Sequence, residues 1–354
     1  MTERGKNLLL AVTAVCLTLF AGEIALRLRH GVSPLDFSNF HRQRATRINE
    51  NAVARYDPTL GWSLKDGVDR PGFHTLAQGI RRNSAEHTGL RRGSILAVGS
   101  SFTEGVQVND EQTWPAQLER LIGRPVDNAG VRAYALDQIV LRAERLLPEA
   151  RPRILLVGLM DTVVRWTGFA TGGKPKPFFT VEDGGLVAHN IPVPSLAYEV
   201  DALAPVKAVL GYSHLIDRMM LRIDAEWWNA GRVSIRNDPM DVSCRLLQRL
   251  KQETDKFDVR TILVVESKAQ DVISADVPPP SLQRVEECAK DMGYELVDGF
   301  AAFRADYKAD PKRLNEYYAP TERGPIHFSE LGNRRIAELV AAALAVEPPI
   351  AGQP

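Results

Sequence analysis

The stretch that decides the fold runs from Ser94 to Gly105 and reads Ser-Ile-Leu-Ala-Val-Gly-Ser-Ser-Phe-Thr-Glu-Gly. Its apolar run, Ile95 to Val98, predicts a buried parallel strand. Gly99 then permits a sharp turn, and two serines follow. A serine at the carboxyl end of a central strand faces the ligand side of an open α/β sheet. The turn therefore indicates Ser101 as a candidate nucleophile.

The same residues have a second interpretation. Ser101 and Glu104 are three positions apart, as in a capping box that satisfies the N–H groups at a helix start and does no chemistry. A phosphate-binding loop is disfavoured because the glycine–lysine pattern it needs is missing. The stretch alone leaves nucleophile and cap open.

Outward from this turn, strands alternate with helices, which is typical of a parallel α/β sheet. The predicted strands are Ile95–Val98, Pro125–Asn128, Arg153–Gly158, Thr261–Val265 and Tyr294–Val297. The predicted helices are Trp114–Leu121, Leu136–Leu147, Val242–Phe257, Leu282–Met292 and Leu331–Leu344. We therefore expect one doubly wound domain over residues 91–348, with a five-stranded parallel sheet between layers of helices.

Three segments fall outside this alternation. Residues 1–30 hold an apolar run, Leu8 to Gly22, which continues through Leu28 to about the 20 residues that a membrane span needs. We expect an uncleaved signal anchor with a cytoplasmic N-terminus, and a cleaved signal peptide is the alternative. Residues 31–90 are polar and predict an arm packed on the main domain. Residues 165–240 predict an insertion, whose apolar stripe from Leu203 to Trp228 fits a lid, a membrane-facing helix or, more commonly, core.

Charge and cysteine content exclude some functions. Lys+Arg and Asp+Glu both number 44, so no basic bias points to nucleic acid. The three cysteines lack the spacing of metal ligands, so we expect no metal and no cofactor. Cys16 lies in the apolar run. For Cys244 and Cys288 the sequence favours two separate buried thiols, with a disulfide as the alternative if the domain is exported.

A serine nucleophile needs a base, and His327 is the best placed of seven histidines. It stands just before the last predicted helix, in a loop that can reach the carboxyl edge of the sheet. There it could take the Ser101 proton and return it to a leaving group. Gly130, after the second strand, could present its N–H to a developing oxyanion. Taken singly, a capping histidine and an ordinary turn glycine remain open.

Together these motifs resemble the SGNH, or GDSL-like, hydrolase superfamily, serine esterases and acyl-transfer enzymes on a flavodoxin-like three-layer sheet. Residues 99–105, Gly-Ser-Ser-Phe-Thr-Glu-Gly, resemble the nucleophile block. Residues 126–131 resemble the oxyanion block, residues 154–161 occupy the third block, and His327-Phe-Ser-Glu-Leu-Gly332 resembles the final block. Glu23-Ile-Ala-Leu-Arg27 and Leu60-Gly-Trp62 resemble membrane-anchored bacterial members. The resemblance implies Ser101 as nucleophile, His327 as base, and the N–H groups of Ser101 and Gly130 as oxyanion donors.

Three positions depart from the family pattern. Ser100 stands where the first block has Asp, and Met160 stands where the third block has an Asn donor. Methionine cannot donate a hydrogen bond. Gly324 stands where the Asp that orients the histidine is expected. Glu322 is the candidate substitute for that Asp, whereas the anionic Asp161 beside the missing donor would oppose an oxyanion.

The sequence thus predicts an exported serine esterase or O-acyltransferase, anchored by a single pass in the bacterial inner membrane with its main domain periplasmic. The resemblance implies an acylated envelope glycan or another small ester as substrate. The missing Asn and Asp motivate the alternative of a weakened member that binds a glycan or an envelope protein partner. A third hypothesis is a membrane-tethered scaffold.

Overall fold

A parallel five-stranded sheet forms the centre of the molecule. A computed structural model describes residues 2–41, 53–170, 175–193, 203–223, 225, 228, 235, 237–320 and 326–345. The strand order across the sheet is β11-β10-β7-β5-β6. The strands are β5 (Ile95–Val98), β6 (Val126–Asn128), β7 (Ile154–Leu159), β10 (Arg260–Val265) and β11 (Glu295–Asp298). Numbered along the chain this is the 2-1-3-4-5 order of flavodoxin-like folds, so the predicted sheet is confirmed.

The middle of the sheet is built from the most apolar runs. Every residue of β5 and β7 is buried, as expected for strands covered by helices on both faces. β5 pairs with both neighbours, since Ala97 lies opposite Asn128 of β6 and opposite Leu156 of β7. The chain order reverses at β5, and the carboxyl end of such a strand is where open α/β sheets bind ligands.

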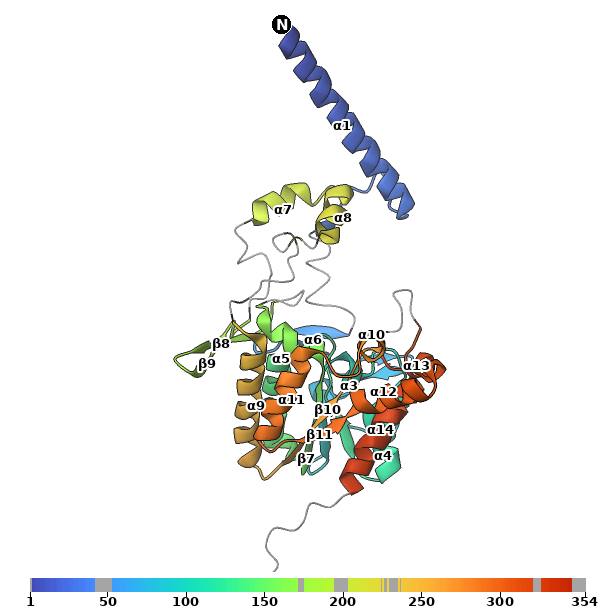
Figure 1. Ribbon diagram of the computed structural model, residues 1–354, viewed down its shortest axis with the longest axis vertical. Helices are drawn as coiled ribbons and strands as arrows, with labels where there is room; N and C mark the ends of the chain where they lie inside the picture. The colour runs from blue at the N-terminus through green and yellow to red at the C-terminus, as the bar shows by residue number, and fades with distance from the viewer. Residues whose placement is uncertain are drawn as a thin grey trace, which may run out of the picture.

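Helices cover both faces of the sheet (Figure 1). α5 (Leu136–Ala150), α9 (Pro239–Asp255) and α11 (Pro280–Asp291) pack together on one side. α4 (Trp114–Ile122) and α14 (Glu330–Ala345) pack together on the other. All five agree with the predicted helices to within a few residues at their ends. The prediction missed other helices around the sheet, among them α3 (Ser101–Glu104), α6 (Asp161–Arg165), α10 (Ala269–Ser274), α12 (Gly299–Ala309) and α13 (Pro311–Tyr317).

The described part of the arm, residues 53–90, shares the main core. β1 (Ala54–Asp57) pairs antiparallel with β2 (Gly61–Leu64), and β3 (Asp69–Arg70) with β4 (Phe73–His74). The Trp62 side chain is buried in the same apolar cluster as β5, and its Nε1 donates to the Arg132 carbonyl over 3.1 Å. The arm is therefore part of the packed domain.

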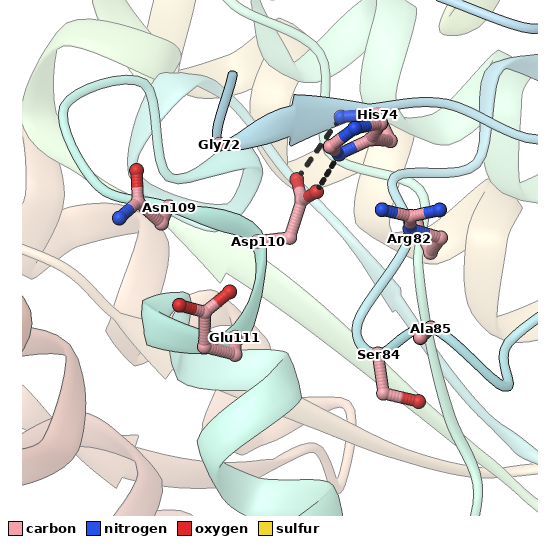
Figure 2. Close-up of a pocket in the computed structure, with 8 residues that line it drawn as sticks. All are labelled: Gly72, His74, Arg82, Ser84, Ala85, Asn109, Asp110 and Glu111. Carbon is pink, nitrogen blue, oxygen red and sulfur yellow. Dashed lines mark hydrogen bonds and ion pairs between the residues drawn. The ribbon is translucent and has the colours of Figure 1, made fainter. Parts of the chain in front are cut away.

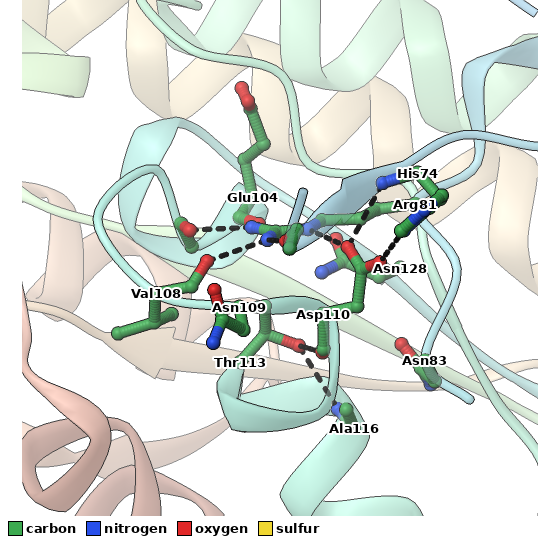
Figure 3. A network of polar contacts seen from close by, with 12 residues as sticks. His74, Arg81, Asn83, Glu104, Val108, Asn109, Asp110, Thr113, Ala116 and Asn128 are labelled. Carbon is green, nitrogen blue, oxygen red and sulfur yellow. Dashed lines mark hydrogen bonds and ion pairs between the residues drawn. The ribbon is translucent and has the colours of Figure 1, made fainter. Parts of the chain in front are cut away.

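One arginine ties the arm to the loop after α3 (Figure 3). The Arg81 side chain is buried, and its Nε donates to Asp110 Oδ1 over 3.0 Å. Its Nη1 donates to the Glu104 carbonyl and its Nη2 to the Val108 carbonyl, each over 2.6 Å. A guanidinium carries five N–H donors in a rigid fork, so this side chain fixes the path of the chain just after the serine turn.

The insertion forms a hairpin and two short helices. The hairpin consists of β8 (Phe178–Glu182) and β9 (Gly185–His189), and the helices are α7 (Ala204–Leu210) and α8 (His214–Arg222). Figure 1 shows α7 and α8 beside the end of α1 and apart from the sheet. The expectation of an apolar core stripe holds for Trp228, which is buried, but is wrong for Met219, which is half exposed.

The expectation of two separate thiols is also wrong. Cys244 on α9 and Cys288 on α11 form a disulfide, because the two helices pack side by side and bring their Cα atoms to 6.0 Å. Cys16 is a free cysteine on the exposed face of α1. Disulfides persist in oxidising compartments such as the periplasm.

The N-terminal helix α1 (Glu3–Arg29) is long and apolar enough to cross a membrane, with a mean hydropathy of 2.2 over its best window. None of that window is buried against the rest of the protein. A signal sequence would meet the same criteria.

Candidate active site

The serine turn places Ser101 at the carboxyl edge of the sheet. β5 ends at Val98, Ser100 is the N-cap residue of α3, and Ser101 is the first residue of that helix. The Ser101 hydroxyl lies 2.9 Å from His327 Nε2, although the two residues are 226 positions apart. The capping-box alternative for Ser101 and Glu104 is wrong, because Ser101 is the first residue of α3 and not its N-cap, and the N-cap residue Ser100 makes no side-chain capping hydrogen bond. Glu104 instead accepts from the Arg132 side chain, with 2.8 Å between Arg132 Nε and Glu104 Oε1.

His327 is held in place from two sides. Its carbonyl accepts a hydrogen bond of 2.9 Å from the Ala319 N–H, and its ring packs against Phe102, with 5.0 Å between the ring centroids. Burial, together with the positive charges of Arg132 and Lys268, lowers the pKa of the imidazole from 6.5 to about 4. The ring is therefore neutral at pH 7, and a neutral ring can accept the Ser101 proton at Nε2.

The charged groups that act on the His327 ring are cationic. Among residues 2–320 and 326–345, as far as they are described, no carboxylate bonds to its ring. Gly324 and the candidate orienting residue Glu322 lie outside the described residues. The described site is thus a Ser–His pair, and the two charges that act on its base, Arg132 and Lys268, are both positive.

Gly130 lies against the serine helix, but its N–H group already has a partner. A Cβ atom at this position would come within 2.4 Å of the Glu104 nitrogen, so only glycine allows this approach. The Gly130 N–H donates to Asn128 Oδ1 over 3.1 Å, while Asn128 Nδ2 donates to the Thr103 carbonyl over 3.0 Å. For the predicted oxyanion role the Gly130 amide would have to exchange Asn128 for the substrate. Because Ser101 is the first residue of α3, its N–H group has no hydrogen-bond partner within the helix.

Two of the residues that depart from the family pattern touch each other. The Ser100 hydroxyl donates to Met160 Sδ over 3.8 Å, and both side chains are buried. Asp161 is engaged elsewhere, since its Oδ2 accepts from Arg165 Nε over 2.8 Å and its Oδ1 from the Ser281 hydroxyl. Neither Met160 nor Asp161 can therefore supply the hydrogen-bond donor that Asn would give.

Glu266 is a buried acid that sequence reasoning missed. It follows β10 directly, and its Oε1 accepts from Thr103 Oγ1 over 2.8 Å and from Trp114 Nε1 over 3.0 Å. Its Oε2 has no hydrogen-bond partner among the described residues. Burial raises the pKa of this carboxyl to about 8, so it is protonated at pH 7 and supports α3 as a neutral group. An acid directly after an apolar strand is a signal that the sequence does carry.

Arg132 and Lys268 were also missed. Arg132 stands two positions after Gly130, and Lys268 stands three positions after the end of β10. Each follows a strand whose carboxyl end contributes to the site, which is the signal that could have identified them.

A cavity of about 240 Å³ lies elsewhere, between the arm and the loop before α4 (Figure 2). His74 lies in its wall with both ring nitrogens against acids, 2.5 Å from Asp110 Oδ2 and 2.9 Å from Asp69 Oδ1. Ser101 and His327 are not among its lining residues. The described residues contain no cluster of three or more His, Cys, Asp or Glu side chains suited to a metal.

Comparison with known proteins gives matches in structure only. No family model and no curated protein matches the chain. Among solved structures, an acetyl xylan esterase, AlAXEase, is 12% identical, with a TM-score of 0.42 and coverage of 71% of this chain and 98% of that one. A protein assigned to the lipolytic G-D-S-L family from Desulfitobacterium hafniense is also 12% identical, with a TM-score of 0.38 and coverage of 71% and 99%. At this identity the likeness concerns the fold alone.

A third neighbour is a variant of Axe2, an acetyl xylan esterase from Geobacillus stearothermophilus. It is 14% identical, with a TM-score of 0.41 and coverage of 73% of this chain and 98% of that one.

Proposed function

We propose that this protein is an SGNH-type serine esterase or O-acyltransferase, exported and held in the bacterial inner membrane by α1. The observation that carries the proposal is the 2.9 Å contact between Ser101 Oγ and His327 Nε2 at the carboxyl edge of the sheet. A nucleophile and its base within hydrogen-bond reach are the minimum that acyl transfer requires.

The reaction would proceed in two balanced steps. Ser101 Oγ attacks the ester carbonyl carbon and gives its proton to His327 Nε2, and the N–H groups of Ser101 and Gly130 hold the oxyanion. The tetrahedral species collapses, and the alcohol leaves with the proton from His327. Water, or the hydroxyl of an acceptor, then attacks the acyl-serine with His327 again as base. Water gives an esterase and an acceptor gives a transferase.

The compartment and the substrate have separate support. The apolar helix α1 and the disulfide between Cys244 and Cys288 both suit a domain on the outer side of the inner membrane. The acylated envelope glycan, or a similar small ester, is proposed from the motif resemblance.

The full chain in detergent provides the test. Wild type, Ser101→Ala and His327→Ala are given p-nitrophenyl acetate and, separately, a fluorophosphonate probe that reacts with activated serines. We expect stoichiometric labelling of wild type, no labelling of Ser101→Ala, and a loss of about 1000-fold or more in hydrolysis for both variants. Ser274→Ala, at an exposed serine on α10, is the matched control. Equal labelling of wild type and Ser101→Ala would refute the nucleophile assignment.

A second candidate function is a weakened member that binds a glycan or an envelope protein. It is favoured by Met160 at the donor position and by the cationic surroundings of His327. This candidate would be supported over the enzyme by a folded protein that binds an acylated oligosaccharide, is not labelled by the fluorophosphonate probe and does not hydrolyse p-nitrophenyl acetate.

A further inference from the structure

Helix α7 has its apolar residues outside and its charged residue inside. Lys207, its one charged side chain, is 4% exposed, whereas Val209 is 72% and Val206 43% exposed. Pro205 and Ala208 are exposed as well. A helix that faces water shows the opposite arrangement, with apolar residues toward the protein and charged residues outside. The outer face of α7 therefore suits an apolar medium.

Segments close to α7 also expose apolar side chains. Leu35 and Phe37, in the turn after α1, are 76% and 79% exposed. Tyr212, between α7 and α8, is about half exposed, and Ile223 at the end of α8 is mostly exposed. Single exposed apolar residues are common on proteins, but a group in adjoining segments marks an interaction surface.

Hydrogen bonds fix α8 to the end of α1. The Glu23 carboxylate, near the end of α1, accepts from Ser213 Oγ and the His214 N–H over 2.8 Å each, and from the Leu215 N–H over 2.7 Å. A carboxylate from one helix thus satisfies N–H groups at the start of another. Arg27 adds a hydrogen bond of 2.9 Å to the Tyr212 carbonyl.

The position of α7 and α8 follows from these contacts. In α1, the side chains of Leu19 and Phe20 are 56% and 67% exposed, and both lie one turn before Glu23. The helix fixed at Glu23 therefore lies beside the C-terminal end of α1 (Figure 1), at the level where the uninterrupted apolar run from Leu8 to Gly22 ends.

From this arrangement we propose that α7, α8 and residues 33–37 form a membrane-surface platform, which lies in the headgroup region of the bilayer that α1 spans. This inference rests on the proposed anchoring by α1. Val206 and Val209 enter the boundary between headgroups and acyl chains, Tyr212 lies at the interface where aromatic residues are enriched, and the exposed Arg218 and Arg222 of α8 face lipid phosphates.

Lipid suits this surface better than a second protein because α8 is hydrogen-bonded to the end of the helix that is proposed to span the membrane, and because α8 carries exposed arginines. With the platform, the protein would contact the membrane in two ways, through one spanning helix and through one surface patch. The sheet domain would then be held by more than a single helix, which restricts how it tilts relative to the membrane.

Fluorescence quenching in vesicles of phosphatidylethanolamine and phosphatidylglycerol tests the platform with the full chain. The native free Cys16 carries an environment-sensitive NBD label in the first sample. In a Cys16→Ala background, Val209→Cys carries the same label, and Leu121→Cys, at an exposed apolar position on α4, carries it as the control. Lipids with a nitroxide near the headgroup, or near the end of the acyl chain, serve as quenchers.

We expect the headgroup nitroxide to quench the label at position 209 at least about twofold more than the label at 121, because an interfacial helix buries its apolar face to about 5–10 Å. Equal quenching at 209 and 121, with Cys16 quenched by the deep nitroxide, would overturn the platform and leave the anchor intact. A blue shift at 209 without quenching would indicate a protein partner and also overturn it. If Cys16 itself is not quenched, the anchor fails and the platform fails with it. Val206→Cys repeats the measurement, in case Val209→Cys does not fold.

Discussion

The base of the proposed dyad should remain active at a pH where an ordinary histidine is charged. Burial is the main cause that lowers the pKa of His327 from 6.5 to about 4, and the nearby cations Arg132 and Lys268 contribute the rest of that shift. A general base works only in its unprotonated form. At pH 5 a ring with this pKa is about 90% neutral, against about 3% for an unperturbed histidine, so kcat/KM at pH 5 should be about 30-fold higher than an ordinary base would allow.

The charge contribution can be separated from burial. Lys268 Nζ donates to Thr162 Oγ1, so Lys268→Gln removes one cation without breaking the Arg132–Glu104 pair. The acid limb of the pH profile should move up by a few tenths of a pH unit, about the size expected for a secondary charge when burial dominates. Lys256→Gln, an exposed ion-pair residue on the far end of α9, should leave the limb in place.

Two measurements report on this pKa. Initial rates of p-nitrophenyl acetate hydrolysis, read at a wavelength independent of p-nitrophenol ionisation, give the acid limb of kcat/KM. NMR titration of the His327 ring gives the same pKa without turnover. Circular dichroism at each pH is the control, because a histidine with a lowered pKa binds fewer protons folded than unfolded, and its contribution to stability is lost as the pH falls from 6.5 toward 4. If the acid limb of kcat/KM or the NMR titration of the ring has its midpoint at pH 6 or above, the ring is solvated or paired with a carboxylate. The described site would then be wrong.

Three further changes test the site and the fold. Met160→Asn restores a donor at the position where the family has one, and hydrolysis should rise by up to about 100-fold; unchanged kcat/KM in a variant with unchanged melting would show that position 160 does not face the oxyanion. Glu266 has a raised pKa of about 8, so it binds more protons folded than unfolded, and wild type should lose stability as the pH rises to 8, by up to about 1.4 kcal/mol per pH unit. The unfolding free energy of Glu266→Gln should not show this decrease with pH. A wild-type unfolding free energy that does not change with pH would contradict the buried acid. Reduction of the Cys244–Cys288 disulfide, which closes a loop of 44 residues, should cost about 4 kcal/mol in the chain-entropy model; an unchanged urea midpoint after reduction would argue that the bond is absent in the native protein.

The sheet was predictable from the sequence because its strands are short apolar runs between turn formers. Runs such as Ile95–Val98 are typical of strands that are buried on both faces, as in a parallel sheet covered by helices. The helix α12 was missed because it begins at the residue after β11, and α13 was missed because it follows α12 after one residue and is only seven residues long. The disulfide was missed because its formation depends on how α9 packs against α11, which no local pattern encodes.

At the site, motifs predicted which residues approach one another but not their hydrogen-bond partners. The proximity of Ser101 and His327 was predicted because one follows the central strand and the other stands in the loop before the last helix, which can reach the same edge of the sheet. The contact of the Gly130 amide with Asn128 depends on one side-chain rotamer, and the neutral state of Glu266 depends on the burial around it. Both are tertiary properties, and so is the cationic environment of His327.

The position of Arg81 determines where a soluble form of this enzyme candidate should begin. Its guanidinium, supplied by the arm, holds the carbonyls of Glu104 and Val108 just downstream of the serine. A truncation at residue 91, at the border of the α/β alternation, would delete that arginine along with Trp62 and leave several chain carbonyls in a dry environment with no donor. Expression trials should therefore start ahead of residue 53, and an inactive shorter fragment should be attributed to the lost arm before its serine is judged inert.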